Sequence, residues 1–366
     1  RHSAFRKSMP FVIRLTAWAG LPVLGIQHTF IVSDDPLTTF FRGIGLRLPV
    51  SEKTTYRETK EGVALLEIQN PPIRQAQDRK SKIKNALGIF VRDRAKLLPK
   101  ENYFDPQTNT LSVYLWPLHG DEMDLRPVLV RQPPDFLEWK RKNPDGFDRL
   151  EGGPMTPQAA LDFFTGRKPV NSMGDWRART GKGVSRTHDL FIATAADAEG
   201  CAARLRPFDR PLFAVCPPSY YAMTAALGHF HPRDPANFPA IERAIDLHLE
   251  WVRRHRDEWS RWRGFWDYGD YLSVYDAKRG AWWKYDDGMR GWNNGEVNTD
   301  HGPFVQFLRT GDRKILDFAE DMARHRMDCD QCHFEDDHPD FVGGVHRHHM
   351  TEHWTGLIDG GHLWVD

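Results

Sequence analysis

Short apolar runs separated by turn-forming residues fill the first half of this 366-residue chain and limit the folds that it can adopt. The runs are rich in β-branched and aromatic side chains, and Gly, Pro and Asp interrupt them, as at Gly20 and at Pro36. They are residues 11–18, 21–32, 43–48, 62–68, 110–116 and 183–194. This pattern is typical of an antiparallel β-sandwich, with Thr108 and Asn109 expected to form the turn before the fifth run.

Helical periodicity replaces this pattern beyond about residue 200. Asn237 is expected to cap a helix that starts near Pro239. One face of that helix is predicted to carry Ile241, Ala244, Ile245, His248, Leu249 and Val252. Thr310, Gly311 and Asp312 separate two further helical segments and predict an antiparallel αα-hairpin. We therefore predict a multidomain β + α fold: an antiparallel β-sandwich (residues 1–200) followed by an incomplete α/α toroid (residues 201–366).

The amino-acid composition limits the classes of ligand that the protein is expected to bind. Lysine plus arginine and aspartate plus glutamate each number 50, so no basic excess points to nucleic acid. No apolar stretch reaches the roughly 18 residues that a membrane span needs. The chain holds 13 tryptophans, and indole rings pack against the apolar faces of sugars. These features predict a carbohydrate partner, with no nucleic acid and no membrane.

The two ends of the chain also shape the expectation. It opens at Arg1 without an initiator methionine and stops at Asp366 within what reads as a new element. We expect both ends to be cut from a longer protein, and the 366-residue piece alone to be inactive or poorly folded. The location is unknown from this sequence; for the full-length protein we expect an extracellular or periplasmic one.

The candidate site residues fall in three polar, aromatic segments, at 265–271, 282–302 and 333–354. The catalytic candidates are Tyr268, His301, His349, His353 and Arg347. The candidates for substrate binding are Trp266, Asp270, Arg290, Trp292, Asn293, Glu296, Asn298 and Trp354.

These residue types suit β-elimination on an acidic sugar. A histidine or tyrosine can remove the proton beside a uronic carboxylate, while Arg or Asn neutralises that carboxylate. Hydrolysis is the alternative, because it needs two carboxylates, which Asp267, Asp270, Glu296 and Asp300 contain. A third possibility is a non-catalytic carbohydrate-binding protein, which would need the tryptophans but not the base candidates.

Metal and cofactor signals are weak. Cys329, Cys332 and His333 match the spacing of a haem attachment motif, without an axial ligand context. A zinc or divalent cation site would have to use the histidines between His338 and His353. We predict no cofactor, and leave a divalent cation at the substrate carboxylate open.

Several of these segments resemble a known family. The residues are 283–285, 291–296, 301–302, 310–312 and 346–354, together with 19–23, 28–30 and 43–47. They resemble the exo-rhamnogalacturonan lyases of polysaccharide lyase family 26. The resemblance implies an N-terminal β domain, a central β-sandwich and a C-terminal α/α toroid. It also implies β-elimination between rhamnose and galacturonate in the pectin backbone. It does not transfer catalytic residues, so the candidates above come from chemistry alone.

Overall fold

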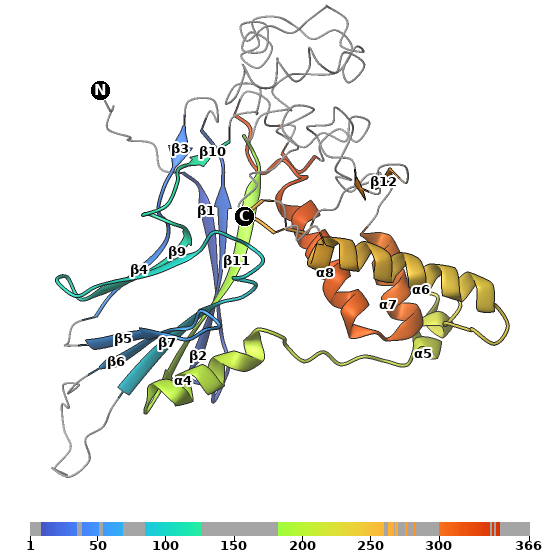
Figure 1. Ribbon diagram of the computed structural model, residues 1–366, viewed down its shortest axis with the longest axis horizontal. Helices are drawn as coiled ribbons and strands as arrows, with labels where there is room; N and C mark the ends of the chain where they lie inside the picture. Colours follow the sequence, from blue (N-terminus) through green and yellow to red (C-terminus); the bar gives the residue numbers. More distant parts are fainter. Residues whose placement is uncertain are drawn as a thin grey trace, which may run out of the picture.

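The computed structural model describes most of two structural regions and the junction between them (Figure 1). The described residues are 9–34, 39–50, 54–68, 85–125, 182–259, 263–266, 268–269, 275–276, 281–282, 300–336, 339 and 342–344. In Figure 1 the sheets lie on the left with helix α4 (Ala198–Leu205) below them, and the helices α5 (Pro218–Thr224) to α8 (Arg313–Asp328) lie on the right.

Two antiparallel sheets form the first region. The six-stranded sheet has the order β1-β2-β11-β7-β6-β5, and the three-stranded sheet has the order β4-β9-β8. The strands of the larger sheet are β1 (Phe11–Ala17), β2 (Val23–Ile31), β5 (Thr54–Glu58), β6 (Ala64–Ile68), β7 (Asn85–Val91) and β11 (Ser185–Ala195). Those of the smaller sheet are β4 (Ile44–Pro49), β8 (Glu101–Asp105) and β9 (Thr110–Trp116). Two short pairs, β3 (Phe40–Phe41) with β10 (Met123–Asp124) and β12 (Tyr275–Asp276) with β13 (Ala281–Trp282), complete the strands described.

The apolar core lies between the two sheets, as the period-2 pattern of the strands predicts. Ile26 and Phe30 of β2 and Leu190 of β11 meet Leu111 and Val113 of β9 there. The predicted antiparallel sandwich is confirmed. Asn109 has a positive φ of 51°, which fits the predicted turn before β9 because asparagine tolerates the left-handed region.

The other face of the large sheet is covered by α4 (Ala198–Leu205), which Figure 1 shows crossing the lower ends of the strands. Ala198, Cys201 and Leu205 pack against Phe90 and Phe191 in a second buried cluster. Asp197 caps this helix by accepting a hydrogen bond from the Gly200 backbone. The domain boundary at residue 200 stays a prediction, and α4 packs with the strands that precede it.

The second region is helical. It contains η3 (Arg206–Phe208), α5 (Pro218–Thr224), α6 (Pro239–Arg254), a π-helical turn η4 (His255–Trp259), α7 (His301–Thr310) and α8 (Arg313–Asp328). The predicted αα-hairpin is confirmed in α7 and α8: Gly311 ends α7 with a φ of 71°, and the Asp312 side chain caps α8. None of the described helices has the length and apolarity to cross a membrane.

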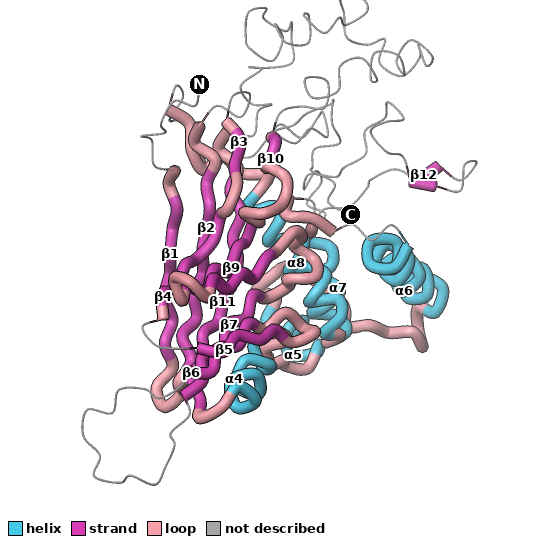
Figure 2. Tube along the Cα trace, turned by 60° about the vertical axis from the view of Figure 1, so that its left-hand side comes forward, coloured by secondary structure: helices cyan, strands magenta, loops and turns pink. Residues whose placement is uncertain are grey.

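The predicted apolar face of α6 is only partly buried. Val252 is buried and packs against Phe318 and Met322 of α8, whereas Ile241 is 60% exposed. The helix contacts α8 near its C-terminal end and diverges from it toward its N-terminus (Figures 1 and 2). The periodicity therefore predicts the helix correctly but overestimates how much of its face meets a neighbour within the described residues.

Strand β11 and the end of α8 join the two regions. The Asp328 carboxylate accepts hydrogen bonds from the Thr187 backbone (2.9 Å) and from the Thr187 hydroxyl (2.7 Å). Arg186 donates from Nη2 to the backbone oxygen of Tyr268 at 2.9 Å. Residues 264–266 and 268–269 are thereby held between the sandwich and α8, with Phe265 inside the sandwich core.

Candidate functional site

A large cavity lies at this junction of sheet and helices. Its volume is about 740 Å³, enough for a sugar-sized ligand. Its wall comes from the end of β7 and the turn after it, from β11, from the segment after η3, from the C-terminal end of α6 with η4, and from α8. The residues that face it are Arg92, Asp93, Lys96, Leu97, Arg186, Asp189, Asp209, Arg210, Pro211, Phe213, Arg253, Arg256, Asp257, Arg263, Tyr268, Phe304, Arg313, Lys314, Asp317, Phe318, Glu320, Asp321, Ala323, Arg324 and Met327.

Positive charge prevails in this wall. Eight arginines and two lysines line the cavity against six aspartates and one glutamate, a surplus of three positive charges. A concave surface with one prevailing sign of charge concentrates ligands of the opposite sign. The cavity therefore suits an anionic ligand.

Tyr268 lies at the centre of the charged groups. Its side chain is 4% exposed, and its hydroxyl donates to Oδ2 of Asp321 at 2.5 Å. Lys96 Nζ lies 5.1 Å from the centre of the phenol ring, and the Arg256 guanidinium carbon lies 5.2 Å from it. The phenol thus has a carboxylate at its oxygen and two cations over its ring.

The charges around Tyr268 act in opposite directions. Burial raises the pKa of the Tyr268 phenol, while Arg256 and Lys96 oppose this effect, and the net pKa lies above its usual range. Burial likewise raises the pKa of Asp321, against the influence of Arg256 and Lys96. In the resting site the phenol is therefore neutral and donates its proton to Asp321.

Lys96 reaches the cavity from the β-sandwich. It follows a turn in which Asp93 adopts a φ of 55°, and the Lys96 backbone donates to the Asp93 carbonyl at 2.9 Å. Its ammonium pairs with Asp93 at 2.9 Å and lies 3.9 Å from Asp321. Burial by itself lowers the pKa of Lys96, but Asp321 and the other neighbours outweigh burial and raise it. Lys96 is thus a charged group that the first region contributes to a site completed by the second.

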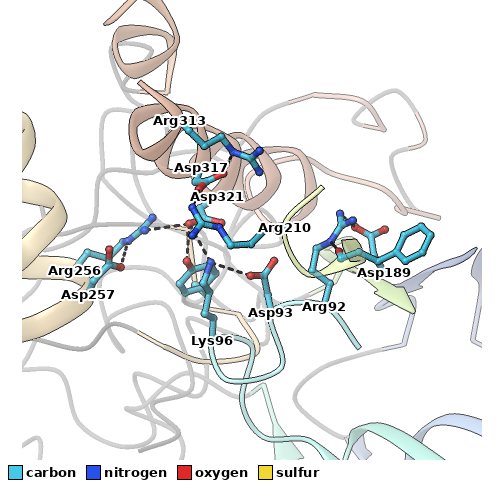
Figure 3. Close-up of polar contacts among 12 residues, drawn as sticks. Arg92, Asp93, Lys96, Asp189, Arg210, Arg256, Asp257, Arg313, Asp317 and Asp321 are labelled. Carbon is cyan, nitrogen blue, oxygen red and sulfur yellow. Dashed lines mark hydrogen bonds and ion pairs between the residues drawn. The ribbon is translucent and has the colours of Figure 1, made fainter. Parts of the chain in front are cut away.

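Further ion pairs line the cavity toward the sheet and toward the start of α8, as Figure 3 shows. Arg92 pairs with Asp189 at 3.2 Å on the sheet side. Asp317 of α8 accepts from Arg210 at 3.1 Å and from Arg313 at 2.5 Å. These pairs orient side chains from four separate segments around one space.

Three of the predicted site residues lie among the described residues, and one of them lines the cavity. Tyr268 lines it. His301 is exposed at the first position of α7, outside the cavity lining, and no contact within the described residues joins it to Tyr268. Trp266 is 0% exposed and belongs to the sandwich core. Because an enclosed indole offers no face to a sugar, we correct its predicted substrate-binding role to packing.

The other predicted site residues lie outside the described residues. They are Asp270, Arg290, Trp292, Asn293, Glu296, Asn298, Arg347, His349, His353 and Trp354. Their roles stay predictions.

Sequence reasoning missed Lys96, Arg256 and Asp321. Arg256 and Asp257 follow α6 as a charged pair within a helical pattern, and Asp321 reads as an ordinary polar position of α8. Only their burial distinguishes them: Arg256 is 4% exposed, and the Asp321 side chain is 12% exposed. The sequence carries no signal for that burial, because it arises from the packing of distant segments.

The cysteines give no support to a metal site among the described residues. Cys329 is buried in the sandwich core, and Cys332 is partly buried. Among the described residues, no group of three His, Cys, Asp or Glu side chains is arranged to hold a metal ion. All five histidines from His338 to His353 lie outside the described residues.

Fold and cavity together define a class of protein: an antiparallel β-sandwich and an α/α toroid domain that share a cation-rich cavity. Residues 1–58 match the family model of the PcRGLX-like protein central beta sandwich domain. Residues 211–356 match that of the PcRGLX-like protein C-terminal alpha/alpha toroid domain. These two stretches of the chain are therefore similar to the two domains of PcRGLX-like proteins.

A curated relative is similar to almost the whole chain. It is described as "Uncharacterized protein YetA" of Bacillus subtilis (strain 168), and it is 24% identical over 418 residues. The alignment covers 96% of this chain and 46% of YetA. The chain thus spans about half the length of this relative.

Proposed function

We propose that the protein is a polysaccharide lyase that cleaves rhamnogalacturonan, the pectin backbone, by β-elimination at a galacturonate residue. The observation that carries the proposal is the position of Tyr268 in the wall of a cavity with surplus positive charge. The match to two PcRGLX-like domains supports it, as does the resemblance of the motifs to rhamnogalacturonan lyases.

The reaction sets three requirements for the site. The C–H bond beside the uronate carboxylate breaks, the C–O bond at the neighbouring carbon breaks, and a carbon–carbon double bond forms. The site must neutralise the carboxylate, accept the proton and return a proton to the departing oxygen. No oxidant, reductant or further reactant is needed.

Tyr268 and Asp321 meet the two proton requirements as a pair. In our proposal Tyr268 passes its proton to Asp321 as it removes the proton beside the substrate carboxylate. Because burial raises the pKa of Asp321, this carboxylate is a stronger proton acceptor than an exposed aspartate. The proton then returns through Tyr268 to the departing sugar oxygen.

The remaining predicted candidates keep their proposed roles. His301 is the second candidate for the base, and His349 and His353 are further ones. Arg290, Arg347 and Asn298 are candidates for carboxylate neutralisation. The proposed partner is an acidic polysaccharide or oligosaccharide, without a required cofactor.

The experiment measures the product of rhamnogalacturonan cleavage by the whole protein. A lyase forms an unsaturated uronide that absorbs in the ultraviolet, whereas a hydrolase releases reducing ends without that absorbance. We expect ultraviolet absorbance to rise, and Tyr268→Phe to lower kcat by about 10²- to 10⁴-fold, the contribution typical of a positioned acid–base group.

The matched control is Tyr220→Phe on α5, where the side chain is 50% exposed and outside the cavity lining. It should leave kcat unchanged. Reducing ends without ultraviolet absorbance would identify a hydrolase instead, with Asp267, Asp270, Glu296 and Asp300 as its candidate carboxylates. Of these, Asp300 forms an ion pair with Arg326 at 2.6 Å.

A further inference from the structure

Arg256 is held in the cavity wall by two of its three guanidinium nitrogens. Nε donates to Oδ1 of Asp257 at 2.8 Å, and Nη2 pairs with Oδ2 of Asp321 at 3.1 Å. The third nitrogen, Nη1, is buried and has no hydrogen-bond partner among the described residues. The side chain as a whole is 4% exposed.

Such a nitrogen is unusual in a folded protein. Buried polar groups are almost always hydrogen-bonded, because a buried donor without an acceptor has lost its hydrogen bonds to water and gained none in return. The two aspartates account for the charge of Arg256 and for two sides of the guanidinium, but not for Nη1. Because Arg256 lines the cavity, a ligand atom there can supply the missing acceptor.

The surroundings specify the chemistry of that acceptor. The cavity carries a surplus of positive charge, and a guanidinium binds a carboxylate more strongly than a neutral oxygen. Oδ2 of Asp321 accepts from the Tyr268 hydroxyl and also pairs with Arg256 Nη2. One carboxylate oxygen thus sets the position of the proposed base relative to the guanidinium.

We infer that Arg256 binds the uronate carboxylate of the substrate through Nη1, next to Tyr268. The inference rests on the proposed function and names a neutralising residue for it. It makes Arg256 a catalytic residue, because negative charge grows on that carboxylate as the neighbouring proton leaves. Asp257 acts as a positioning residue that fixes the guanidinium plane, and Asp321, the proposed proton acceptor, holds the other side of that plane.

The test is a binding experiment that needs no turnover. The probes are galacturonate and its methyl ester, which lacks the negative charge and carries one added methyl group. Neither probe contains a glycosidic bond that could be cleaved. Titration calorimetry on the whole protein is expected to show that the acid binds 10- to 100-fold more tightly than the ester. Arg256→Gln is expected to abolish this difference.

Two further variants separate binding from folding. Arg254→Gln, two positions earlier, removes an exposed arginine that pairs with Glu258 at 3.0 Å outside the cavity lining, and it should keep the full difference. Arg256→Lys keeps the charge but loses the planar fork, and it should reduce the difference at least threefold. Circular dichroism reports whether each variant folds. If Arg256→Gln does not fold, the result for Arg256→Lys decides whether the inference holds.

Equal binding of acid and ester by the unmodified protein would overturn the inference whatever the variants do. A folded Arg256→Gln protein that still prefers the acid would overturn it too, as would a folded Arg256→Lys protein with the full difference. Carboxylate-dependent binding without an unsaturated product would refute the lyase proposal and leave this inference standing. An unsaturated product with equal binding of acid and ester would support the lyase proposal and refute this inference.

Discussion

Buried histidines set the response of this protein to acid. His188 of β11 lies 5.0 Å from the Phe265 ring, and neither of its ring nitrogens has a hydrogen-bond partner among the described residues. Burial, reinforced by Lys100 and Arg186, lowers the pKa of His188 well below its ordinary value. Burial, reinforced by Arg186, lowers that of His325 to about 3.

We expect the free energy of unfolding to fall as the pH drops from the ordinary histidine pKa toward 3. In that range the unfolded chain takes up protons that the folded protein excludes, so stability rises with pH. Each such histidine contributes at most about 1.4 kcal/mol per pH unit. Urea denaturation at pH 7 and at pH 5 measures the slope, and His188→Leu should reduce it.

The control for this prediction is His229→Leu, which replaces an exposed histidine. It should leave the slope as it is. If His188→Leu shows the same acid sensitivity as the unmodified protein, His188 does not contribute to it.

At the residue scale the sequence predicts chemistry better than position. Tyr268 is a candidate because a phenol among aspartates and tryptophans suits proton transfer to a sugar; it lines the cavity, and its catalytic role stays a proposal. The sequence could not show that Trp266 lies in the core whereas Tyr268, two positions later, lines the cavity. Lys96 and Asp321 could not be identified, because the contact between them joins segments separated by most of the chain.

Close approach of backbone fixes the segment that carries Tyr268. Gly269 adopts a φ of 104°, and a Cβ added there would collide with the Asp321 backbone oxygen and would lie 2.7 Å from the Cβ of His325. Gly311 at the end of α7 also has a positive φ, of 71°, but a Cβ there would meet nothing within 4 Å. Substitution at Gly311 therefore tests backbone strain alone, whereas substitution at Gly269 tests strain together with lack of space.

We expect Gly269→Ala to destabilise the protein by about 3 kcal/mol or more, since strain and overpacking add. Gly311→Ala should cost only about 1 kcal/mol, because strain acts alone. Denaturant unfolding of both variants gives the two values, and only Gly269→Ala should also lower kcat. Equal losses would show that α8 yields to the added methyl group.

At the element scale, local sequence signals predict helices and turns well, but they do not predict which neighbouring elements pack against them. The αα-hairpin follows from Gly311 and from the apolar spacing on either side of it, both of which are local. Strands β5, β7 and β8 lack a comparably clear signal, and pairing within the sheets completes them. The exposure of Ile241 on α6 depends on how far α8 extends beside it, which no periodicity reports.

Asp328 forms a buried polar link between the sandwich and the helices. Its carboxylate accepts two hydrogen bonds from Thr187, and its backbone oxygen accepts one from Ser185 at 3.3 Å. Asp328 is 4% exposed, so water cannot replace these bonds without opening the junction.

We expect Asp328→Ala to lower stability by about 2–4 kcal/mol, since it leaves buried donors unmet. It should also split unfolding into two steps, because the two regions lose two of the buried hydrogen bonds that join them. Calorimetry detects the second transition. Asp312→Ala serves as the control at the other end of α8: it removes a helix cap for about 1 kcal/mol and should keep a single transition.

At the scale of the whole molecule the order of the two regions was predictable, because strand and helix periodicities occupy separate halves of the chain. Their junction was not. The bonds between Thr187 and Asp328 span 141 residues, and nothing local marks either partner.

The cavity draws its wall from segments as far apart in the chain as Lys96 and Asp321. An occupant that touches both therefore acts as a removable crosslink between sandwich and toroid. By mass action, a ligand at 100 times its Kd adds about 2.7 kcal/mol to the folded form. Binding of such a ligand would thereby stabilise the junction between the two regions, and its release would remove that stabilisation.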